Sequence, residues 1–299
     1  VAVLMQHVKV VKELVERGAD ATVEDRMGLT PLHFAYLIQH EPILQALGDA
    51  AKLAPISSTH NATPQELAEG LSFAIQAPPV LVRVMDREGV AQKLDGDAFL
   101  VKTGVRYTRT CLFTDEYLQT FYSSILDDEG MALLADPRKR ELSAQYRASQ
   151  EEDRLALAYI SEEVGYGVFS LGEVEEGAYV CCYAGLVQDL QRIREQAKNS
   201  YVMTVMPVER FPFKTDATLY RSFGAYINHS DTPNLTCEHI VAKGAALIVF
   251  VANKRIGAGE QLGFDYRGRL HTTYCEKSIP TFGPLSPLPA PHLAALQKL

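Results

Sequence analysis

The chain has 299 residues and a net charge of −8, with 47% hydrophobic and 22% charged residues, a globular composition that argues against disorder. This length exceeds that of one usual domain, so we expect two domains and a connector. No apolar run approaches the roughly 18 residues of a membrane span, and no signal pattern opens the chain, so we expect a soluble protein. The acidic balance argues against nucleic acid as the main partner and is compatible with a basic protein partner.

Residues 1–77 repeat with a period of 33 residues. Thr30-Pro31-Leu32-His33-Phe34-Ala35 recurs in weakened form as Thr63-Pro64-Gln65-Glu66-Leu67-Ala68, and Gln6-His7 recurs as Gln39-His40. Helically spaced apolar residues lie between these marks: Val10, Val11 and Leu14 in a first helix, and Ile43, Leu44 and Leu47 in its counterpart. Thr30 is suited to cap a helix and Pro31 to occupy its first position. The period and the motif resemble ankyrin repeats.

The second repeat is degenerate, because Asn61 replaces a glycine and Gln65-Glu66 replaces the Leu-His pair. Only about two repeats are visible, whereas a free-standing stack usually needs three or so. Two interpretations stay open. The repeats either offer a surface to a protein partner or act as a structural buttress. Because the first residue is Val1 and not Met, we also expect the sequence to be a fragment or a processed product.

Residues 78–153 form a mixed connector region. Short strands are expected over Val80–Val84 and Ala98–Val101, and a helix over Thr114–Leu134. The stretch from Asp136 to Arg154 is dense in both signs of charge, which indicates a solvated helix. No chemical role is assigned to residues 80–150.

Residues 154–269 change to short apolar strands separated by glycine turns, which is typical of a small, mostly β domain. The expected strands are Leu155–Ile160, Val168–Ser170, Ala178–Cys182, Tyr201–Val205, Leu235–Ile240 and Ala245–Ala252. With the helical repeats before it, this domain gives an α+β fold class. The remaining residues, 270–299, are rich in proline and end in a short, partly apolar helix over His292–Leu299, so we interpret them as a lid or tail.

Six ordered segments of this domain resemble SET-domain lysine methyltransferases. They are Gly165-Tyr166-Gly167-Val168-Phe169, Tyr183-Ala184-Gly185, Asn199-Ser200-Tyr201, Asp216-Ala217, Asn228-His229-Ser230-Asp231-Thr232-Pro233-Asn234, and Gly259-Glu260-Gln261-Leu262-Gly263-Phe264-Asp265-Tyr266. The resemblance implies a knot-like crossing of two segments and transfer of methyl groups from S-adenosylmethionine to a protein lysine.

The same resemblance assigns roles to individual residues. Tyr266 is expected to be the catalytic tyrosine, and Tyr183 a second tyrosine of the lysine channel. Phe264 stands at the position that sets how many methyl groups are added, and phenylalanine there predicts di- or trimethylation. The expected cofactor-binding residues are Gly165, Tyr166, Gly167, Tyr201, Asn228 and His229.

The chain departs from many relatives at the zinc site. Asp231 stands where they carry a cysteine that joins three later ones, and only Cys275 remains downstream. None of the five cysteines shows metal-ligand or disulfide spacing, so we expect no metal and reduced intracellular thiols. Residues 270–283 are therefore expected to form the lid without zinc. Ala225 is a further departure, since relatives often carry arginine there.

We expect a basic protein substrate, with a histone tail plausible, and a protein partner for the ankyrin-like repeats. Proteins that combine such repeats with a SET domain occur in the nucleus and among effectors that bacteria deliver into host cells, and both locations stay open. The alternative function is a non-catalytic interaction protein whose SET-like domain has lost activity. Calorimetry with S-adenosylmethionine separates these two functions.

Overall fold

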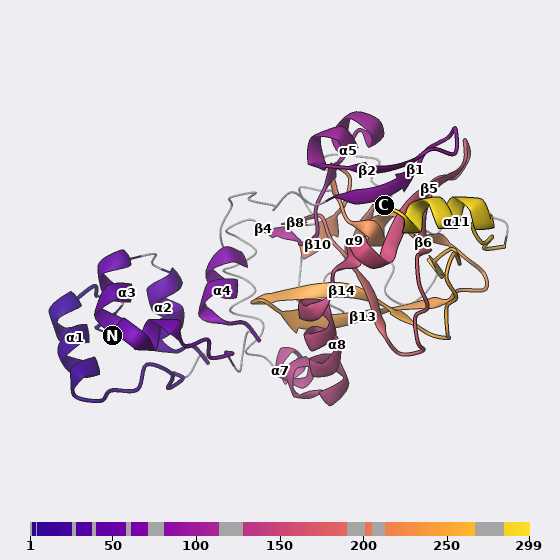
Figure 1. Ribbon diagram of the computed structural model, residues 1–299. Coiled ribbons are helices and arrows are strands. Elements are labelled where there is room, and N and C mark those ends of the chain that lie inside the picture. The colour runs from indigo at the N-terminus through magenta and orange to yellow at the C-terminus, as the bar shows by residue number, and fades with distance from the viewer. Residues whose placement is uncertain are drawn as a thin grey trace. The chain divides into compact units, whose positions relative to one another are not determined.

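The computed structural model describes residues 2–3, 5–25, 28–37, 40–57, 61–70, 81–113, 128–189, 201–204, 213–266 and 284–299. It divides into two compact units that mix helices and strands (Figure 1). The first unit comprises Val1–Ile75, Phe113–Arg140 and Val241–Ala246. The second comprises Gln76–Leu112, Glu141–Ile240 and Leu247–Leu299. The expected mixed fold class is confirmed, whereas ankyrin repeats and the knot-like crossing stay predictions.

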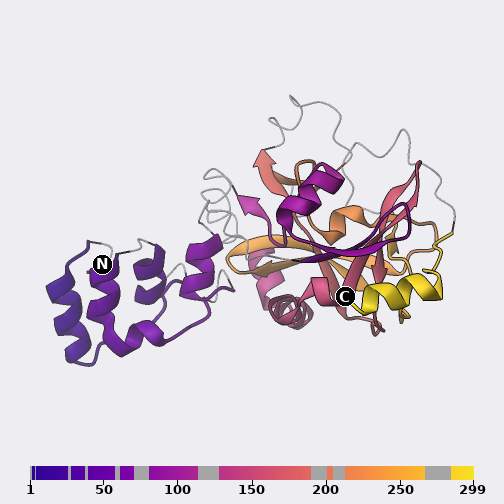
Figure 2. The ribbon, with the colours of Figure 1, turned by 45° about the horizontal axis from the view of Figure 1, so that its top comes forward.

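The first unit contains helices that pack in pairs, α1 with α3 and α2 with α4, and their shared orientation is visible in Figure 2. The elements are α1 (Val8–Glu16), α2 (Pro31–Leu37), α3 (Glu41–Leu47), the 3₁₀ helix η1 (Gly48–Lys52), α4 (Pro64–Gly70) and, further along the chain, α7 (Asp128–Ala135). Val8 and Glu41 begin equivalent helices 33 residues apart, as do Pro31 and Pro64. The period that the sequence shows is therefore the period of the helices.

Helices α2 and α4 are capped at their N-termini in the same way, although the capping residues differ in part. Thr30 Oγ1 accepts from the amide of His33 at 3.3 Å, and the Thr30 amide donates to His33 Nδ1 at 3.2 Å. Thr63 and Glu66 repeat both bonds at 3.2 and 3.0 Å, with the glutamate carboxylate in place of the imidazole. This reciprocal pattern is a capping box. The degenerate second motif thus keeps its capping chemistry.

Asn61 also keeps the backbone conformation of the glycine that it replaces. Gly28 has φ +67° and Asn61 has φ +45°, both in the left-handed region that asparagine tolerates better than most residues. The Asn61 side chain donates to the carbonyl of Val241 at 2.8 Å, and its carbonyl accepts from the amide of Lys243 at 3.1 Å. Asn61 therefore joins the helical repeats to the 241–246 turn, which belongs to the same unit.

The second unit is built from several small sheets. One has the order β2-β1-β5-β6, a second β4-β8-β10-β9, and a third β13-β14-β7, beside the pairs β11-β3 and β12-β15. The bounds are β1 (Val82–Met85), β2 (Ala91–Leu94), β3 (Arg106–Tyr107), β4 (Leu112–Phe113), β5 (Leu155–Ser161), β6 (Gly165–Ser170), β7 (Tyr179–Tyr183), β8 (Leu186–Asp189), β9 (Val202–Thr204), β10 (Phe213–Asp216), β11 (Tyr220–Arg221), β12 (Asn228–His229), β13 (Leu235–Ala242), β14 (Ala245–Ala252) and β15 (Gly263–Phe264). All six strands expected between residues 154 and 269 are present, with small shifts at their ends.

The strand expected at Ala98–Val101 was wrong. These residues lie inside helix α5 (Gly96–Thr103). Asp95 caps the helix by accepting from the Ala98 amide at 2.9 Å, and Gly104 ends it at φ +75° in the left-handed conformation. The Asp95 cap and the Gly104 stop were sequence signals for a helix. The prediction rested on the apolar run Ala98–Val101 and did not use these signals.

The charged stretch after Asp136 is only partly solvated. It forms α8 (Pro137–Ala148) and α9 (Glu151–Arg154), and Glu151 and Glu152 are buried. Glu152 accepts hydrogen bonds from Tyr107 and pairs with Arg109. The interpretation as a fully solvated helix was therefore wrong for these two glutamates. Of the helix expected over Thr114–Leu134, residues 114–127 lie outside the described residues, and α7 covers the rest.

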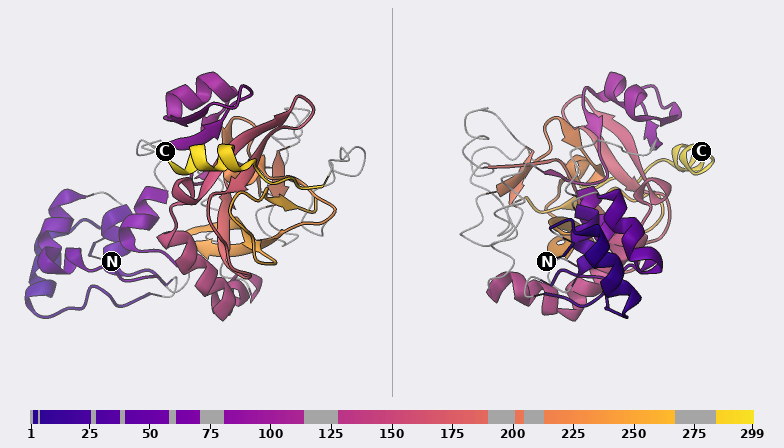
Figure 3. Two further views of the ribbon diagram at one scale, coloured as in Figure 1. Left: turned by 45° about the vertical axis from the view of Figure 1, so that its right-hand side comes forward. Right: turned by 90° about the vertical axis from the view of Figure 1, so that its left-hand side faces the viewer.

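The C-terminal helix α11 (Ala290–Gln297) packs against β1 and β2 (Figure 3). Leu296 is fully buried in a cluster with Met85, Phe169 and Leu171, and the Gln297 side chain donates to the Leu171 carbonyl at 2.7 Å. Residues 284–299 are thus an integral part of the second unit. Residues 270–283, the proposed lid, lie outside the described residues. No helix in the described part is long and apolar enough to cross a membrane.

Candidate functional site

Two segments far apart in the chain pair at the centre of the candidate site. Strand β12 pairs in parallel with β15, so that Asn228 lies opposite Gly263 and His229 opposite Phe264. The amide of Ser230 continues the ladder by donating to the Phe264 carbonyl at 3.0 Å. The two sequence segments that carried the strongest resemblance, residues 228–234 and 259–266, therefore pair with each other through β12 and β15.

Asn234, the last residue of the first string, holds this pairing in place. Its side chain donates to the Gln261 carbonyl and accepts from the Gly263 amide, both at 2.9 Å, and it is 2% exposed. A buried asparagine with both ends of its amide satisfied fixes the backbone of the neighbouring segment. The sequence pattern contained Asn234 but suggested no role for it.

Tyr266 is held at both its backbone and its side chain. Its amide donates to Nδ1 of His229 at 3.1 Å, and its hydroxyl donates to the Ile227 carbonyl at 2.7 Å. The other ring nitrogen of His229, Nε2, lies 3.4 Å from Oδ1 of Asp231. Asp231, which stands at the missing cysteine position, thus faces a cofactor-binding candidate.

Phe264 lies between two other aromatic rings. Its centroid is 4.7 Å from that of Phe250 and 4.7 Å from that of Tyr266, with both ring pairs tilted. Such contacts are favourable beyond the burial of their area and fix ring orientation. The structure therefore brings Phe264, Tyr266 and His229 together.

Tyr183 is the last residue of β7 and is buried. Burial, and after it the nearby Tyr266, raise the pKa of the Tyr183 hydroxyl well above its ordinary value, while Arg221 acts in the opposite direction. The backbone of Gly224 presses against β7 so closely that a Cβ atom there would lie 2.5 Å from the Cys182 carbonyl oxygen and 2.9 Å from Cα of Tyr183. Glycine at 224 thus lets the 3₁₀ helix η2 (Phe223–Tyr226) approach the strand.

Two further segments of the pattern, which carry Tyr201 and Asp216-Ala217, meet beside the segment of Tyr183. A Cβ atom on Gly185 would lie 2.4 Å from the Asp216 carbonyl oxygen, so this glycine is required for the close approach. The Ala217 amide donates to the Tyr201 carbonyl at 2.8 Å. Tyr201 is 38% exposed, so its ring remains partly open to a ligand.

Arg221 was missed by the sequence reasoning. Its side chain is buried, with the guanidinium carbon 3.7 Å from the centroid of the Tyr201 ring and 4.9 Å from that of Tyr226. Nε donates to the Ala217 carbonyl at 3.0 Å. It lies four residues before Ala225, where an arginine was expected. An arginine close to position 225, in a segment rich in aromatic residues, was the sequence signal that could have pointed to Arg221.

The two glycines of β6 have different surroundings, since Gly165 faces open space and Gly167 lies against other side chains. A Cβ atom on Gly165 would meet nothing within 4 Å, and its φ of +75° suits glycine. At Gly167 a Cβ atom would lie 2.5 Å from Ile160 and 3.1 Å from the Asn228 side-chain nitrogen. That nitrogen donates to the Tyr166 carbonyl at 3.3 Å, which links β6 to β12.

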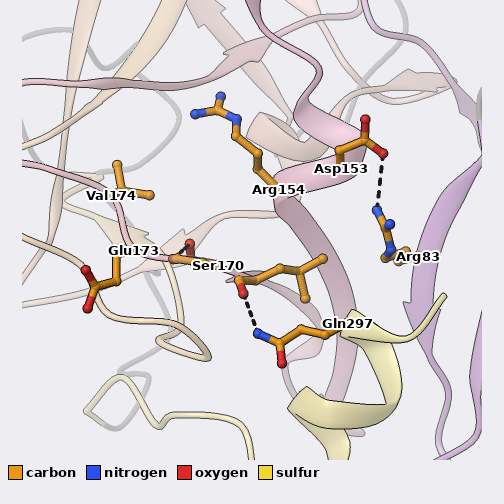
Figure 4. A pocket seen from close by; sticks show the side chains of 9 residues that line it. Arg83, Asp153, Arg154, Ser170, Glu173, Val174 and Gln297 are labelled. Carbon is orange, nitrogen blue, oxygen red and sulfur yellow. Dashed lines mark hydrogen bonds and ion pairs between the residues drawn. The ribbon is translucent and has the colours of Figure 1, made fainter.

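A separate pocket lies away from these residues. It has a volume of about 200 Å³ and is lined by Arg83, Asp153, Arg154, Ser170, Leu171, Gly172, Glu173, Val174 and Gln297 (Figure 4). None of the predicted site residues lines it, so we do not assign it to them. Within the described ranges, no group of three or more His, Cys, Asp or Glu side chains could hold a metal ion.

Residues 165–267 match the family model described as "SET domain". The mouse histone-lysine N-methyltransferase EHMT1 is 33% identical over 138 residues, which cover 42% of this chain and 10% of that protein. The Arabidopsis thaliana "Histone-lysine N-methyltransferase, H3 lysine-9 specific SUVH5" is 30% identical over 138 residues, or 44% of this chain and 17% of that protein. The chain thus spans only a small part of the length of the curated relatives that it matches.

Among solved structures, "ctPRC2 in an autoinhibited conformation bound to S-adenosylmethionine" is 30% identical, with a TM-score of 0.36. The similarity covers 41% of this chain and 16% of that one. Together with the pairing of β12 and β15, the family match leads to one conclusion. The chain contains a SET domain over residues 165–267.

Proposed function

We propose that this chain is a protein-lysine N-methyltransferase that uses S-adenosylmethionine. The observation that carries the proposal is the pairing of β12 with β15 inside the SET domain, which brings Tyr266 and Phe264 beside His229. The relatives named as histone-lysine N-methyltransferases support the same activity.

The residues around β6 and β12 fit a polar nucleoside cofactor. Gly165 faces open space, Gly167 lets the Asn228 side chain approach β6, and Asn228 and His229 add polar groups there. We assign cofactor binding to these four residues together with Tyr166 and Tyr201. S-adenosylmethionine, when bound, supplies a methyl group that its sulfonium has already activated.

The protein's own task is to align a neutral lysine amine. At pH 7 a lysine of ordinary pKa near 10.4 must lose its proton at a cost of about 4 to 5 kcal/mol. A desolvated channel disfavours the ammonium form and lowers that cost. The Tyr183 hydroxyl stays neutral, since its pKa lies well above the ordinary value, so it serves as a hydrogen-bonding group and not as a base.

We infer that Tyr266 is the catalytic tyrosine. Its hydroxyl donates to the Ile227 carbonyl, which orients the phenol, and a phenolic oxygen can also accept a hydrogen bond, here from the substrate amine. Phe264 packs against the Tyr266 ring and adds no polar group beside it. An apolar ring there leaves room for a methylated amine, so we propose di- or trimethylation.

We further propose a basic protein substrate, with a histone tail as the leading candidate, and hence a nuclear protein. Delivery into a host cell as a bacterial effector is the alternative location. The ankyrin-like repeats are proposed to bind a protein partner, and residues 270–283 to cover the lysine channel without zinc.

Mass spectrometry of a methylation reaction tests the activity. The full chain is incubated with S-adenosylmethionine and a panel of histones, nucleosomes and cell lysate. We expect di- and trimethyl-lysine with the wild type and a loss of roughly 100-fold or more in Tyr266→Phe. Phe264→Tyr should shift the products toward monomethyl-lysine.

Tyr36→Phe is the matched control, because Tyr36 lies in the first unit and donates to the Ala51 carbonyl. It should keep wild-type activity. Undiminished lysine methylation by Tyr266→Phe would reject the catalytic role of that tyrosine. Absence of S-adenosylmethionine binding in calorimetry would favour the non-catalytic interaction protein instead.

A further inference from the structure

Arg221 presents a buried positive charge beside the candidate site. The residue is 9% exposed, and its guanidinium lies against the rings of Tyr201 and Tyr226. Arginine remains charged in proteins, so this charge cannot be removed by loss of a proton. Its position therefore demands compensation from the surroundings.

That compensation is incomplete. The two ring faces and the Ala217 carbonyl attract the guanidinium, but all three groups are neutral. In the part of the chain that the structure describes, no carboxylate forms an ion pair with Arg221. Two other buried carboxylates of this unit do have ion-pair partners, since Glu152 pairs with Arg109, and Asp86 pairs with Lys102 at 2.8 Å. Arg221 is thus prepared for an anion that the described protein groups do not supply.

The location of Arg221 narrows the choice of anion. Tyr201, whose ring the guanidinium covers, is partly exposed, and Arg221 and Tyr266 both act on the buried hydroxyl of Tyr183. A substrate lysine is cationic and would be repelled by a guanidinium. The methyl donor carries an α-carboxylate, and a guanidinium can bind a carboxylate through two parallel hydrogen bonds.

We propose that Arg221 binds the carboxylate of the methyl donor, with its guanidinium held in position by the rings of Tyr201 and Tyr226. This inference rests on the proposed methyltransferase function. It assigns to Arg221 a specificity-determining role, because donors that lack the carboxylate leave its charge buried and unpaired. Removal of one partner from a buried charged pair is strongly unfavourable.

Calorimetry with two donors tests the assignment. S-adenosylmethionine and its decarboxylated form, which differ only in the carboxylate, are titrated into the full-length wild type and into Arg221→Met and Arg221→Lys. We expect the wild type to prefer S-adenosylmethionine by about 10- to 100-fold, the range of a charge-assisted contact. Arg221→Met should reduce that preference to less than about threefold, with Arg221→Lys in between.

The exposed Arg255, which pairs with Glu173 at 2.6 Å, provides the matched control Arg255→Met, and the wild-type preference should persist there. A wild type that binds both donors equally overturns the assignment, and this result does not require any variant to fold. Equal losses for both donors in a folded Arg221→Met also overturn it. A wild type that binds neither donor rejects the proposed function itself, whereas methylation with unchanged donor preference in Arg221→Met rejects only the inference.

Discussion

Glu151 places an ionisable carboxyl group beneath the strand that carries Tyr183. Its Oε1 accepts hydrogen bonds from the Tyr179 hydroxyl and, at 3.1 Å, from the Cys182 amide, both on β7. Oε2 is buried and has no hydrogen-bond partner among the described residues. Burial raises the pKa of Glu151 from 4.5 to about 8, while the bond from Tyr179 opposes the shift and the neighbouring Glu152 adds to it.

This raised pKa predicts a pH-dependent stability. Between pH 4.5 and about 8 the folded protein holds a proton on Glu151 that the unfolded chain has lost. Stability from this group is therefore complete below pH 4.5 and is lost as pH rises through 8, at up to about 1.4 kcal/mol per pH unit. Glu151→Gln should remove this contribution, so that its free energy of unfolding relative to the wild type rises between pH 6 and pH 8.5.

Chemical denaturation of the second unit at these two pH values measures the effect. Glu176→Gln changes an exposed glutamate and serves as the matched control, which should follow the wild type. Identical slopes for the wild type and Glu151→Gln would show that Glu151 does not titrate in this range. The run Glu151-Glu152-Asp153-Arg154 looked solvated in the sequence, because burial of a glutamate depends on distant strands.

At the scale of the helix, equivalent residues of the two repeats differ in environment. Val10 and Leu14 of α1 are 49% and 45% exposed, whereas Ile43 and Leu47, 33 residues later in α3, are 0% and 2% exposed. The later pair packs in the cluster that includes Val11 of α1. The apolar pattern predicted both helices, but only packing decided which of their apolar residues are buried.

This difference predicts unequal effects of alanine substitution. Ile43→Ala removes buried methyl groups from a packed cluster and should lower the free energy of unfolding of the first unit by about 2 to 4 kcal/mol. Val10→Ala, at the equivalent exposed position, should change it by less than about 0.5 kcal/mol. Denaturant unfolding followed by helical circular dichroism measures both. Similar losses in the two variants would contradict the observed packing.

In the second unit, the C-terminal helix α11 packs into the core beside β1 and β2. Helix α11 joins Leu296 to Met85 and Phe169, and Lys93 donates to the Leu299 carbonyl at 3.0 Å. The Leu288 amide also donates to the Gly259 carbonyl at 2.8 Å, which ties the tail to the segment that leads into β15. Removal of residues 270–299 would therefore remove this core packing together with the proposed lid at residues 270–283.

Because α11 packs against the core, we expect Leu296 to contribute to the free energy of unfolding of the second unit. Leu296→Ala should lower the free energy of unfolding of the second unit by about 2 to 4 kcal/mol, because Leu296 is fully buried. Leu299→Ala is the matched control, since Leu299 is 38% exposed, and its effect should stay below about 1 kcal/mol. Thermal unfolding of the full chain measures both variants. An unchanged melting temperature in Leu296→Ala would show that the helix contributes no packing energy.

Features that depend on local pattern or on ordered motifs could be predicted from the residues alone. The 33-residue period located the paired helices, alternating apolar runs located the strands after residue 154, and the ordered motifs identified the SET domain. The cap at Thr30 was predicted, whereas the equivalent cap at Thr63 became evident only in the structure.

Features that join distant segments became evident only in the folded chain. The parallel pairing of β12 with β15, the clamp by Asn234 and the burial of Arg221 and Glu151 each depend on neighbours far away in the chain. The strand expected at Ala98–Val101 failed because a short apolar run fits a helix or a strand equally well. Local pattern fixes the elements, whereas the environment of a charged side chain is set only when those elements pack.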